Sequence, residues 1–381
     1  MARSYGFLST HPPTHCGLAT FNSSLVAHLG DARTGVVRIV SDADDLRPGP
    51  AVVHTWPMRA ANGWREAADA LNAFDVAVVQ HEYGIFPGVD GRDVVPVLHR
   101  LTVPSIVVLH TVLAKPTSGQ KAVLERVVAA ADAVVTMTGT ARDRLVHGYV
   151  VDPAKVTVIP HGAPVFADAG EPAAPRQPNH LLTWGLLGPG KGIEWALRAL
   201  ASLRDIEPAP TYTVAGRTHP KVLELHGDAY RAGLYQLGAQ LGVSSLVRYE
   251  SAYQDADTLG RMIRSADVVV LPYDSVEQVT SGVLVEAVNA GVPVVATRFP
   301  HAVELLTRGP GLLVPHRDPK ALAAAIRRIL TDPALAAELT GARRRTSQSL
   351  LWPAVAQRYA ALADALVDRR DLVPVAAVAA A

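Results

Sequence analysis

The sequence predicts an α/β protein with two facing, doubly wound domains and a ligand cleft between them. Three observations support this fold: the length of 381 residues, the recurrence of short apolar runs, and a proline-rich interruption near the middle of the chain. Apolar runs that alternate with helical segments are typical of parallel sheets buried on both faces. Ligands of such sheets bind beyond the carboxyl ends of the strands, so two facing domains form a cleft.

The composition limits the class of protein. A chain that is 49% hydrophobic and 19% charged can bury a core large enough for two domains. The formal net charge of +1 disfavours nucleic acid as a partner. The single cysteine, Cys16, rules out an internal disulfide and a cysteine-based zinc site. A single cysteine suits a reducing compartment, so we expect a cytoplasmic protein. No apolar run reaches the roughly 18 residues of a membrane helix, so we expect no integral membrane segment. Nothing in the sequence indicates the oligomeric state.

Twelve apolar runs are expected to be strands, six in each half of the chain. They lie at 5–10, 35–40, 75–82, 104–111, 132–138 and 155–162, and then at 180–185, 211–216, 246–251, 267–273, 292–297 and 311–316. Segments with helical periodicity separate most of them, for example 120–130 and 193–203. This alternation predicts one doubly wound domain in each half.

Proline and alanine crowd together at 163–180, where no periodicity is visible. This composition is typical of a linker. We therefore expect an N-terminal domain at 1–165 and a C-terminal domain at 178–348. An amphipathic helix at 349–370 is expected to cross back toward the N-terminal domain, and 371–381 are expected to form a flexible tail.

The N-terminal half offers polar groups where its expected strands end. Gly17 follows two prolines between the first strand and the first helix, where a backbone can approach a ligand closely; an ordinary turn explains it equally well. His81, Glu82 and His110 follow two strands and are expected to face a site, although a lone histidine there is often a strand-end cap. His161 closes the half beside the linker.

Lys191 follows a glycine-rich turn after the expected strand at 180–185. At such a turn a lysine can neutralise a diphosphate, with help from the N–H groups of the loop. The glycine spacing fits neither a Walker loop nor G-x-G-x-x-G, so an exposed lysine on a tight turn remains the alternative. Arg217 and His219 follow the next strand and can serve a phosphate or lie at the surface.

The segment "EQVTSGVLVEAVNAGVPVVAT" at 277–297 predicts a helix N-terminus that could bind a phosphate. Thr280, Ser281 and Gly282 open the expected helix, and Gly291 ends it. A carboxylate in such an apolar helix needs a partner, and a ribose with two adjacent hydroxyls would suit Glu286. The alternative is a plain helix with an ordinary cap.

Two D-x-D pairs could in principle hold a metal ion. Asp42 and Asp44 fit a surface loop, and Asp255 and Asp257 open an expected helix that Asp255 would cap. We therefore expect no metal site.

Taken in order, these motifs resemble the retaining nucleotide-sugar glycosyltransferases of family 4, which have two Rossmann-like domains (the GT-B fold). The likeness extends over nearly the whole chain, through "PPTHCGLATF", "VIPHG", "KGIEWALRAL", "SADVVVLPY" and "TSGVLVEAVNAGVPVVAT". The signatures "LHTVLAKP", "GLLGPGKGIE" and "THP" look like those of a bacterial subgroup whose acceptor is not identified from the sequence.

The resemblance implies roles for individual residues. Glu286 matches the second glutamate of the family's E-x7-E motif, which holds the donor ribose. Lys191 matches the lysine that binds the donor diphosphate, and Gly17 matches the loop that closes over it. His110 matches a histidine beside the transferred sugar. Ser281 and Gly282 lie at the helix start that faces the distal phosphate.

Two positions depart from the family pattern. Gln278 stands where the first glutamate of E-x7-E is usual, and Leu186 replaces an arginine that usually binds the diphosphate. A glutamine can still bond sugar hydroxyls, and Arg217 could replace the missing cation. Loss of one charge-assisted contact weakens binding by about 1.5–3 kcal/mol unless another group replaces it.

The resemblance implies transfer of a hexose to an acceptor hydroxyl with retention, without a metal or other cofactor. The donor would be GDP-mannose or, failing that, UDP-glucose, with the base near Tyr249 and Tyr253 and the acceptor near His81, Glu82 and His110. Two alternatives use the same donor pocket: a sugar-nucleotide 2-epimerase and a catalytically silent nucleotide-sugar binding protein. A dinucleotide-dependent oxidoreductase is disfavoured, because no strand leads into G-x-G-x-x-G.

Overall fold

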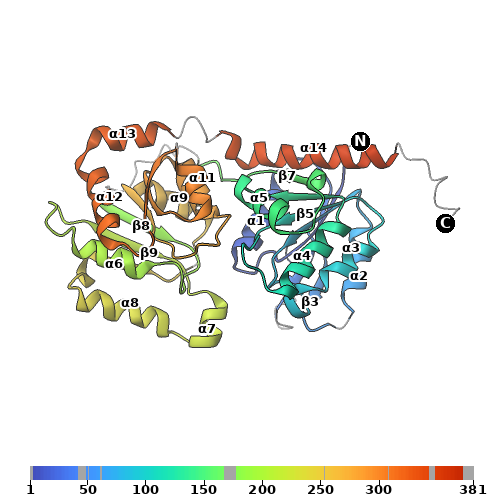
Figure 1. Ribbon diagram of the computed structural model, residues 1–381, viewed down its shortest axis with the longest axis horizontal. Coiled ribbons are helices and arrows are strands. Elements are labelled where there is room, and N and C mark those ends of the chain that lie inside the picture. Colours follow the sequence, from blue (N-terminus) through green and yellow to red (C-terminus); the bar gives the residue numbers. More distant parts are fainter. Residues whose placement is uncertain are drawn as a thin grey trace. The chain divides into compact units, whose positions relative to one another are not determined.

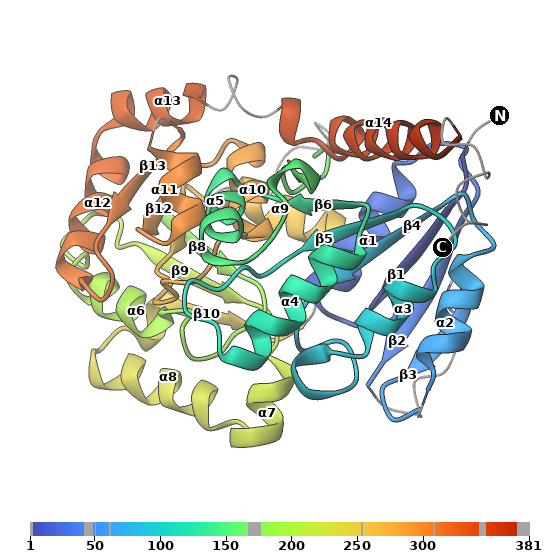
Figure 2. The same ribbon diagram turned by 45° about the vertical axis from the view of Figure 1, so that its right-hand side comes forward.

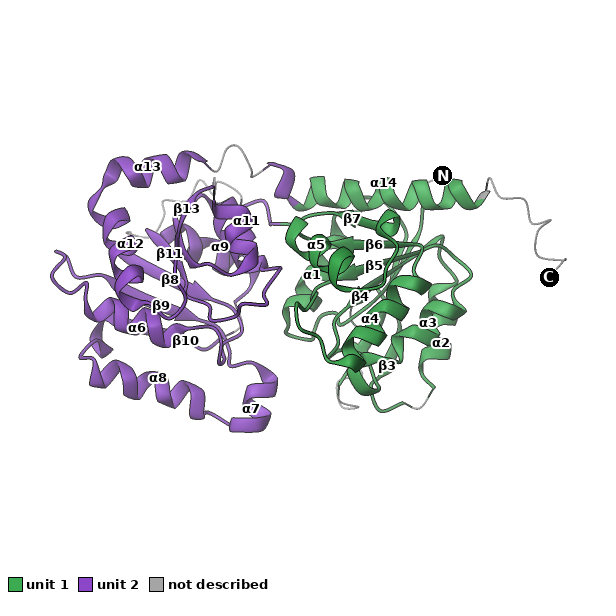
Figure 3. Cartoon of the chain, in the orientation of Figure 1, with its two compact units in different colours: residues 1–162, 352–381 green, residues 163–351 purple. Residues whose placement is uncertain are grey.

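The structure is a computed structural model that describes residues 3–41, 49, 51–60, 62–166, 177–252, 254–307, 309–342 and 348–371. The Asp42–Asp44 pair, Tyr253 and nearly all of the expected tail at 371–381 lie outside these residues. The chain divides into two compact units (Figure 3): unit 1 is Met1–Gly162 with Trp352–Ala381, and unit 2 is Ala163–Leu351. The first segment of unit 1 ends at Gly162, three residues before the boundary expected at 165. Unit 1 also includes the C-terminal helix.

Unit 1 has a parallel sheet in the order β3-β2-β1-β4-β5-β6-β7, seven strands within the described residues (Figure 1). The strands are β1 (Tyr5–Ser9), β2 (Thr34–Val40), β3 (Val52–Pro57), β4 (Val76–His81), β5 (Ser105–Leu109), β6 (Ala133–Thr136) and β7 (Val156–Val158). The helices are α1 (Gly17–Ala27), α2 (Trp64–Leu71), α3 (Val94–Arg100), α4 (Ser118–Ala130), α5 (Gly139–Gly148) and α14 (Trp352–Asp371).

The prediction of six strands in this half was wrong, because the structure has β3 as a further strand. It pairs with β2 at the edge of the sheet, and most of its residues are partly exposed. An edge strand faces solvent along one side, so it need not be a continuous apolar run. Its sequence "VVHTWP" therefore carries a weaker strand signal than the central strands.

The two faces of the unit 1 sheet are covered by different helices (Figure 2). Helices α2, α3 and α4 lie side by side on one face. On the other face, Phe21 of α1 and Trp352, Val355 and Tyr359 of α14 pack in one core with residues of the central strands. The C-terminal helix thus contributes to the core of the unit in which the chain begins.

Unit 2 has a second parallel sheet, in the order β10-β9-β8-β11-β12-β13 within the described residues. Its strands are β8 (His180–Trp184), β9 (Thr211–Ala215), β10 (Val247–Glu250), β11 (Val268–Leu271), β12 (Val294–Thr297) and β13 (Gly311–Val314). Its helices are α6 (Ile193–Ala201), α7 (Pro220–His226), α8 (Ala229–Gln240), α9 (Ala256–Ser265), α10 (Gly282–Ala290), α11 (Pro300–Leu306), α12 (Pro319–Thr331) and α13 (Pro333–Ala342).

Both faces of the unit 2 sheet are buried, as its uninterrupted apolar strands predict. Leu181 and Val268 point into a core shared with α6, α8 and α12. Their neighbours Leu182 and Val269 point into the opposite core, against α9, α10 and α11. This alternation is the two-residue period of a strand. Among the described residues, no helix is both long and apolar enough to cross a membrane.

Candidate functional site

The turn after β8 brings Lys191 to the carboxyl end of β11. Gly192 in this turn has φ 66°, and a Cβ atom there would lie 1.8 Å from the carbonyl oxygen of Pro272, so only glycine fits. Lys191 Nζ lies 4.3 Å from the centre of the Tyr273 ring. Burial lowers the pKa of Lys191 to about 8, and no carboxylate of the described residues offsets this shift. The turn thus holds a partly buried cation that can receive an anion.

Helix α10 begins beside Tyr273 with two N–H groups available. Ser281 caps the helix, since its Oγ accepts from the N–H of Leu284 at 3.2 Å. Its own N–H donates to His301 Nδ1 at 2.8 Å, so this group is already used. The N–H groups of Gly282 and Val283 have no acceptor among the described residues, and the buried Thr280 hydroxyl likewise has no partner there.

Glu286 has a partner that the sequence did not reveal. Its Oε2 accepts from Trp184 Nε1 at 3.0 Å, across 102 positions of the chain. Burial raises the pKa of Glu286 to about 7, although the hydrogen bond from Trp184 acts in the opposite direction. The only sequence signal for Trp184 is its place directly before the strand-end glycine. One side chain therefore orients the carboxylate at the carboxyl end of the sheet.

The remaining predicted donor residues lie around this cluster. The side-chain amide of Gln278 donates to the carbonyl of Thr280 at 3.2 Å, which holds it beside the start of α10. Arg217 is exposed beyond β9, and its carbonyl accepts from Leu187 at 2.8 Å. His219 caps α7 by accepting from the N–H of Lys221 at 3.2 Å. The structure thus brings Lys191, Gln278, Thr280, Ser281, Gly282 and Glu286 to one edge of the sheet, and places Arg217 at the surface.

In unit 1, Gly17 and His110 lie beyond the carboxyl ends of the strands. Gly17 is the first residue of α1, and no other atom would lie within 4 Å of a Cβ placed on it, so its backbone faces open space. His110 Nε2 donates to Gln80 Oε1 at 2.8 Å. Burial lowers the pKa of His110 to about 3, so the ring is neutral and Nδ1 carries the lone pair.

The Gln80 amide continues into a buried polar chain. Its Nε2 donates to Asn22 Oδ1 at 3.5 Å, and Asn22 Nδ2 donates to His11 Nδ1 at 3.2 Å. All three of these residues are at most 5% exposed. This chain holds the amide of Gln80 in one orientation and thereby fixes the tautomer of His110.

His81 and Glu82 lie near His110 at the ends of β4 and β5, but neither offers a ligand a hydrogen-bond acceptor comparable to His110 Nδ1. His81 is fully buried against the rings of Tyr83 and Phe86, and burial lowers its pKa to about 4. The Glu82 carboxylate accepts from the N–H of Tyr83 at 3.0 Å and from the hydroxyl of Thr111. Of these three residues, His110 offers the clearest acceptor atom for a ligand.

Two further features of unit 2 do not add to this cluster. Asp255 caps α9 by accepting from the N–H of Thr258 at 2.8 Å, which confirms the capping prediction for the second D-x-D pair. An open hollow of about 1240 Å³ is lined by residues such as Asn179, Asp267 and Pro293, which precede strands. It therefore lies at the opposite edge of the sheet from Lys191, whereas ligands of parallel sheets bind at the carboxyl ends.

Solved structures with the same architecture define the class of protein. Anabaena Alr3699/HepE in complex with UDP and glucose has a TM-score of 0.77 at 17% identity, covering 95% of this chain and all of that one. Sucrose-phosphate synthase from Thermosynechococcus elongatus has a TM-score of 0.74 at 20% identity, covering 96% and 100%. Two parallel doubly wound units of this kind make the chain a GT-B protein.

Family models give the more specific assignment. The model described as Glycosyltransferase Family 4 matches residues 17–165, and the model of glycosyl transferases group 1 matches residues 178–332. The chain belongs to glycosyltransferase family 4.

Several curated relatives of the chain carry the same name. A D-inositol 3-phosphate glycosyltransferase of Kineococcus radiotolerans is 31% identical over 256 residues, which is 61% of this chain and 57% of the relative. One of Frankia alni is 29% identical over 349 residues, covering 82% and 84%. Over four of these relatives the match spans only 52% to 58% of their length.

Proposed function

We propose that the protein transfers a hexose from a nucleoside diphosphate to an acceptor hydroxyl, with retention of configuration and without a metal ion. One observation carries this proposal: the partly buried Lys191 cation, with no carboxylate among the described residues to offset its pKa shift, lies against the same Tyr273 ring that adjoins the start of α10. A diphosphate would satisfy both the cation and the N–H groups of Gly282 and Val283.

The carboxylate of Glu286 supports a nucleotide as the source of this diphosphate. With Trp184 on Oε2, its remaining acceptor sites suit the two adjacent hydroxyls of a ribose. Binding of those hydroxyls would replace part of the solvation that burial removes, and so favour the ionised form. Gly17 and His110 of unit 1 are proposed to contact the donor, and His81 and Glu82 to shape the acceptor side.

In the proposed reaction, the bond between the anomeric carbon and the β-phosphate oxygen breaks. The acceptor oxygen bonds to that carbon on the face from which the diphosphate leaves, and its proton departs with the diphosphate. Lys191 and the first N–H groups of α10 would stabilise the charge that develops on the leaving group. No protein nucleophile is needed for this route.

The donor and acceptor define the first assays. The sequence resemblance favours GDP-mannose, whereas Anabaena HepE has been solved with UDP-glucose. D-inositol 3-phosphate is the first acceptor to test, because the relatives are named for it.

The test combines thermal shifts with GDP, UDP, ADP and NAD and NMR of the matching sugar nucleotide in EDTA. We expect one nucleoside diphosphate to stabilise the protein, and sugar to be released or transferred with its anomer retained. Glu286→Ala should weaken nucleoside diphosphate binding by about 10- to 100-fold, since it removes a charged hydrogen-bond acceptor. Glu338→Ala, on the exposed surface of α13, is the matched control and should change nothing.

Other outcomes identify other functions. Binding without turnover of either donor would indicate a silent binding protein, and conversion of the donor to its C2 epimer would indicate the epimerase. Stabilisation by NAD alone, or unchanged affinity in Glu286→Ala, would contradict the donor site. Loss of turnover in EDTA would overturn metal independence.

A further inference from the structure

Arg231 is a buried cation that the proposed mechanism leaves without a role. It belongs to α8 and is only 9% exposed. Its Nη2 donates to the carbonyl of Gly216 at 2.6 Å, whereas Nη1 is buried and has no partner among the described residues. Among these residues no carboxylate forms an ion pair with it. Burial of a guanidinium without a counter-ion is costly, so this arrangement indicates a place for an anion.

The guanidinium lies beside the turn that carries Lys191. Gly216 directly follows β9, and a Cβ atom on it would lie 2.0 Å from the carbonyl oxygen of Gly185, which directly follows β8. The turns that follow the two strands are joined, because Leu187 donates to Arg217 and accepts from His219, both at 2.8 Å. Arg231 is therefore held just beyond the carboxyl end of β9, beside the residue that precedes Leu186.

Two tyrosines add to the polar group around Arg231. Tyr230 and Tyr249 interact with it electrostatically, and their hydroxyls are buried without partners among the described residues. Tyr230 also interacts with the carboxylates of Glu194 and Asp274. Buried polar atoms are normally hydrogen-bonded, so two unpartnered hydroxyls beside the unpartnered Nη1 of Arg231 are unusual in a folded core. A phosphate has enough acceptor oxygens to serve all of them.

Leu186 is the position where family 4 proteins usually carry a second diphosphate cation. We propose that Arg231 binds the donor diphosphate in place of the arginine that this chain lacks at Leu186, a role that rests on the function proposed above. Arg217 is the other candidate, but it is exposed, so solvent screens its charge more than that of the buried Arg231. Arg231 is already held by Gly216, so its guanidinium is preorganised for a phosphate.

The experiment compares Arg231→Met with the wild-type protein for two kinds of ligand. Affinities for UDP and GDP are measured by calorimetry, and those for uridine and guanosine by NMR titration. We expect the variant to lose about 10- to 100-fold in affinity for the diphosphate that binds, and less than about 2-fold for its nucleoside. Arg327→Met is the control for loss of an arginine elsewhere in unit 2. Arg327, on α12, donates to the carbonyl of Ser202 at 3.0 Å and also forms an ion pair with Asp205.

A rescue variant separates a missing charge from a damaged fold. Leu186→Arg combined with Arg231→Met should recover at least half of the lost diphosphate affinity on a logarithmic scale. If Arg231→Met had instead damaged the structure at the end of β9, an arginine at position 186 would not restore this affinity. The ligand-free melting temperature of Arg231→Met should stay the same or rise, since a buried unpaired charge is removed. If Arg231→Met does not fold, Arg231→Lys is tested in its place. This variant should bind the nucleoside diphosphate more weakly and the nucleoside with unchanged affinity.

Three results would overturn the proposal. The diphosphate affinity of the variant could stay within 2-fold of wild type, the nucleoside affinity could fall by the same factor, or the rescue could fail. Each of these removes the role of Arg231 and leaves the proposed function standing. Failure of the wild-type protein to bind UDP, GDP or ADP would instead remove the proposed function and this inference together.

Discussion

At the scale of single residues, burial and hydrogen-bond donors change the pKa of Glu286 in opposite directions. Its carboxylate is ordered by Trp184 Nε1, yet burial raises its pKa to about 7 from the usual 4.5. Without a ligand, the carboxyl of Glu286 in the folded protein is therefore mainly protonated only below about pH 7, where an ordinary glutamate is already ionised down to its usual pKa. A ligand that donates hydrogen bonds would recover the charged form, which is the behaviour expected of a binding group.

The raised pKa predicts a pH-dependent stability. Between pH 4.5 and 7 the folded protein keeps a proton that the unfolded chain releases, so this group stabilises at low pH and its contribution is lost as the pH rises through 7. Glu286→Gln removes the titration and keeps an acceptor for Trp184. The free energy of unfolding of the variant, relative to wild type, should therefore increase by about 2–3 kcal/mol from pH 5 to pH 8.

Urea unfolding of both proteins at the two pH values measures this difference. The neutral, buried histidines are common to both proteins, so their titration cancels in the comparison. A difference between the two proteins that does not change with pH would show that Glu286 has an ordinary pKa.

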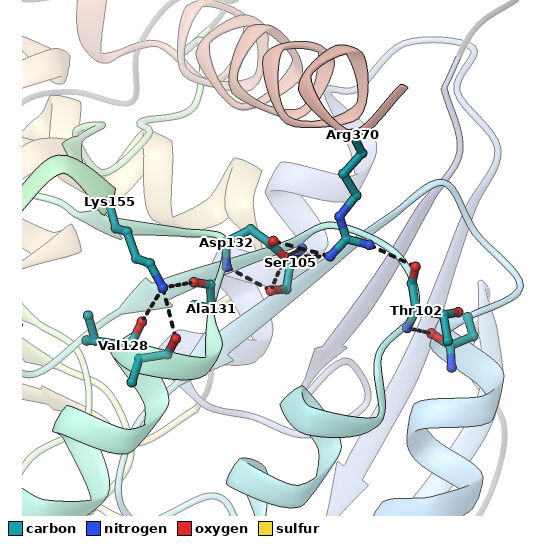
Figure 4. Close-up of polar contacts among 9 residues, drawn as sticks. Thr102, Ser105, Val128, Ala131, Asp132, Lys155 and Arg370 are labelled. Atoms are coloured by element: carbon teal, nitrogen blue, oxygen red, sulfur yellow. Dashed lines mark hydrogen bonds and ion pairs between the residues drawn. The ribbon is translucent and has the colours of Figure 1, made fainter. Parts of the chain in front are cut away.

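At the scale of elements, α14 is attached to unit 1 in two chemically different ways. Near its start, Trp352 and Tyr359 are 3% and 1% exposed in the apolar core. At its end, Arg370 donates to the carbonyl of Thr102 at 2.8 Å and to both carboxylate oxygens of Asp132 at 3.2 Å (Figure 4). Asp132 in turn accepts from the N–H and hydroxyl of Ser105 at 2.8 and 2.9 Å, so the contact joins α14 to the loops that precede β5 and β6.

We predict that the apolar contact dominates the stability of this attachment. Trp352→Ala should lower the free energy of unfolding of unit 1 by about 3–5 kcal/mol, because it leaves a large cavity. Arg370→Ala should lower it by less than about 1 kcal/mol, because the side chains of Arg370 and Asp132 are 42% and 33% exposed and their ion pair is solvated.

Urea unfolding of the two variants checks this ranking, with Arg142→Ala as a control for loss of an exposed arginine. Equal destabilisation by Trp352→Ala and Arg370→Ala would mean that the polar contact holds the helix. That result would contradict the ranking.

At the scale of the whole molecule, the chain has two units that each bury their own cores. The cores of unit 2 lie on the two faces of its sheet, and the core of unit 1 includes residues from both ends of the chain. Each unit has enough internal apolar contact to unfold as a separate cooperative domain.

The donor nucleotide should therefore act on one unit in particular. Lys191, Gly282 and Glu286 all belong to unit 2. A nucleoside diphosphate at 100 times its Kd should stabilise unit 2 by about 2.7 kcal/mol, with a smaller effect on unit 1. Hydrogen exchange with and without the nucleotide measures this, and Trp352→Ala identifies the unit 1 transition in a thermal scan. Protection confined to unit 1 would contradict the assignment of the donor residues.

The sequence by itself determined the elements and their ends. Strands buried on both faces must be apolar runs, so the central strands of both sheets were predictable, and the caps Ser281 and Gly291 depend on local chemistry that neighbouring residues reveal. Lys191 and Glu286 were predictable as candidates, because a strand-end turn and a lone carboxylate in an apolar helix are local features.

Only the tertiary structure decided which of these groups meet. The bond from Trp184 to Glu286, that from His110 to Gln80 and that from Arg231 to Gly216 each join different elements. The return of α14 to unit 1 was expected from the sequence, but its packing with Phe21 of α1 and the central strands was not. Local periodicity specifies which face of an element is buried but not which element covers it, since that depends on strand order and on the path of each crossover. The same reason explains why β3 was missed, because its strand character comes from pairing with β2 at the edge of the sheet.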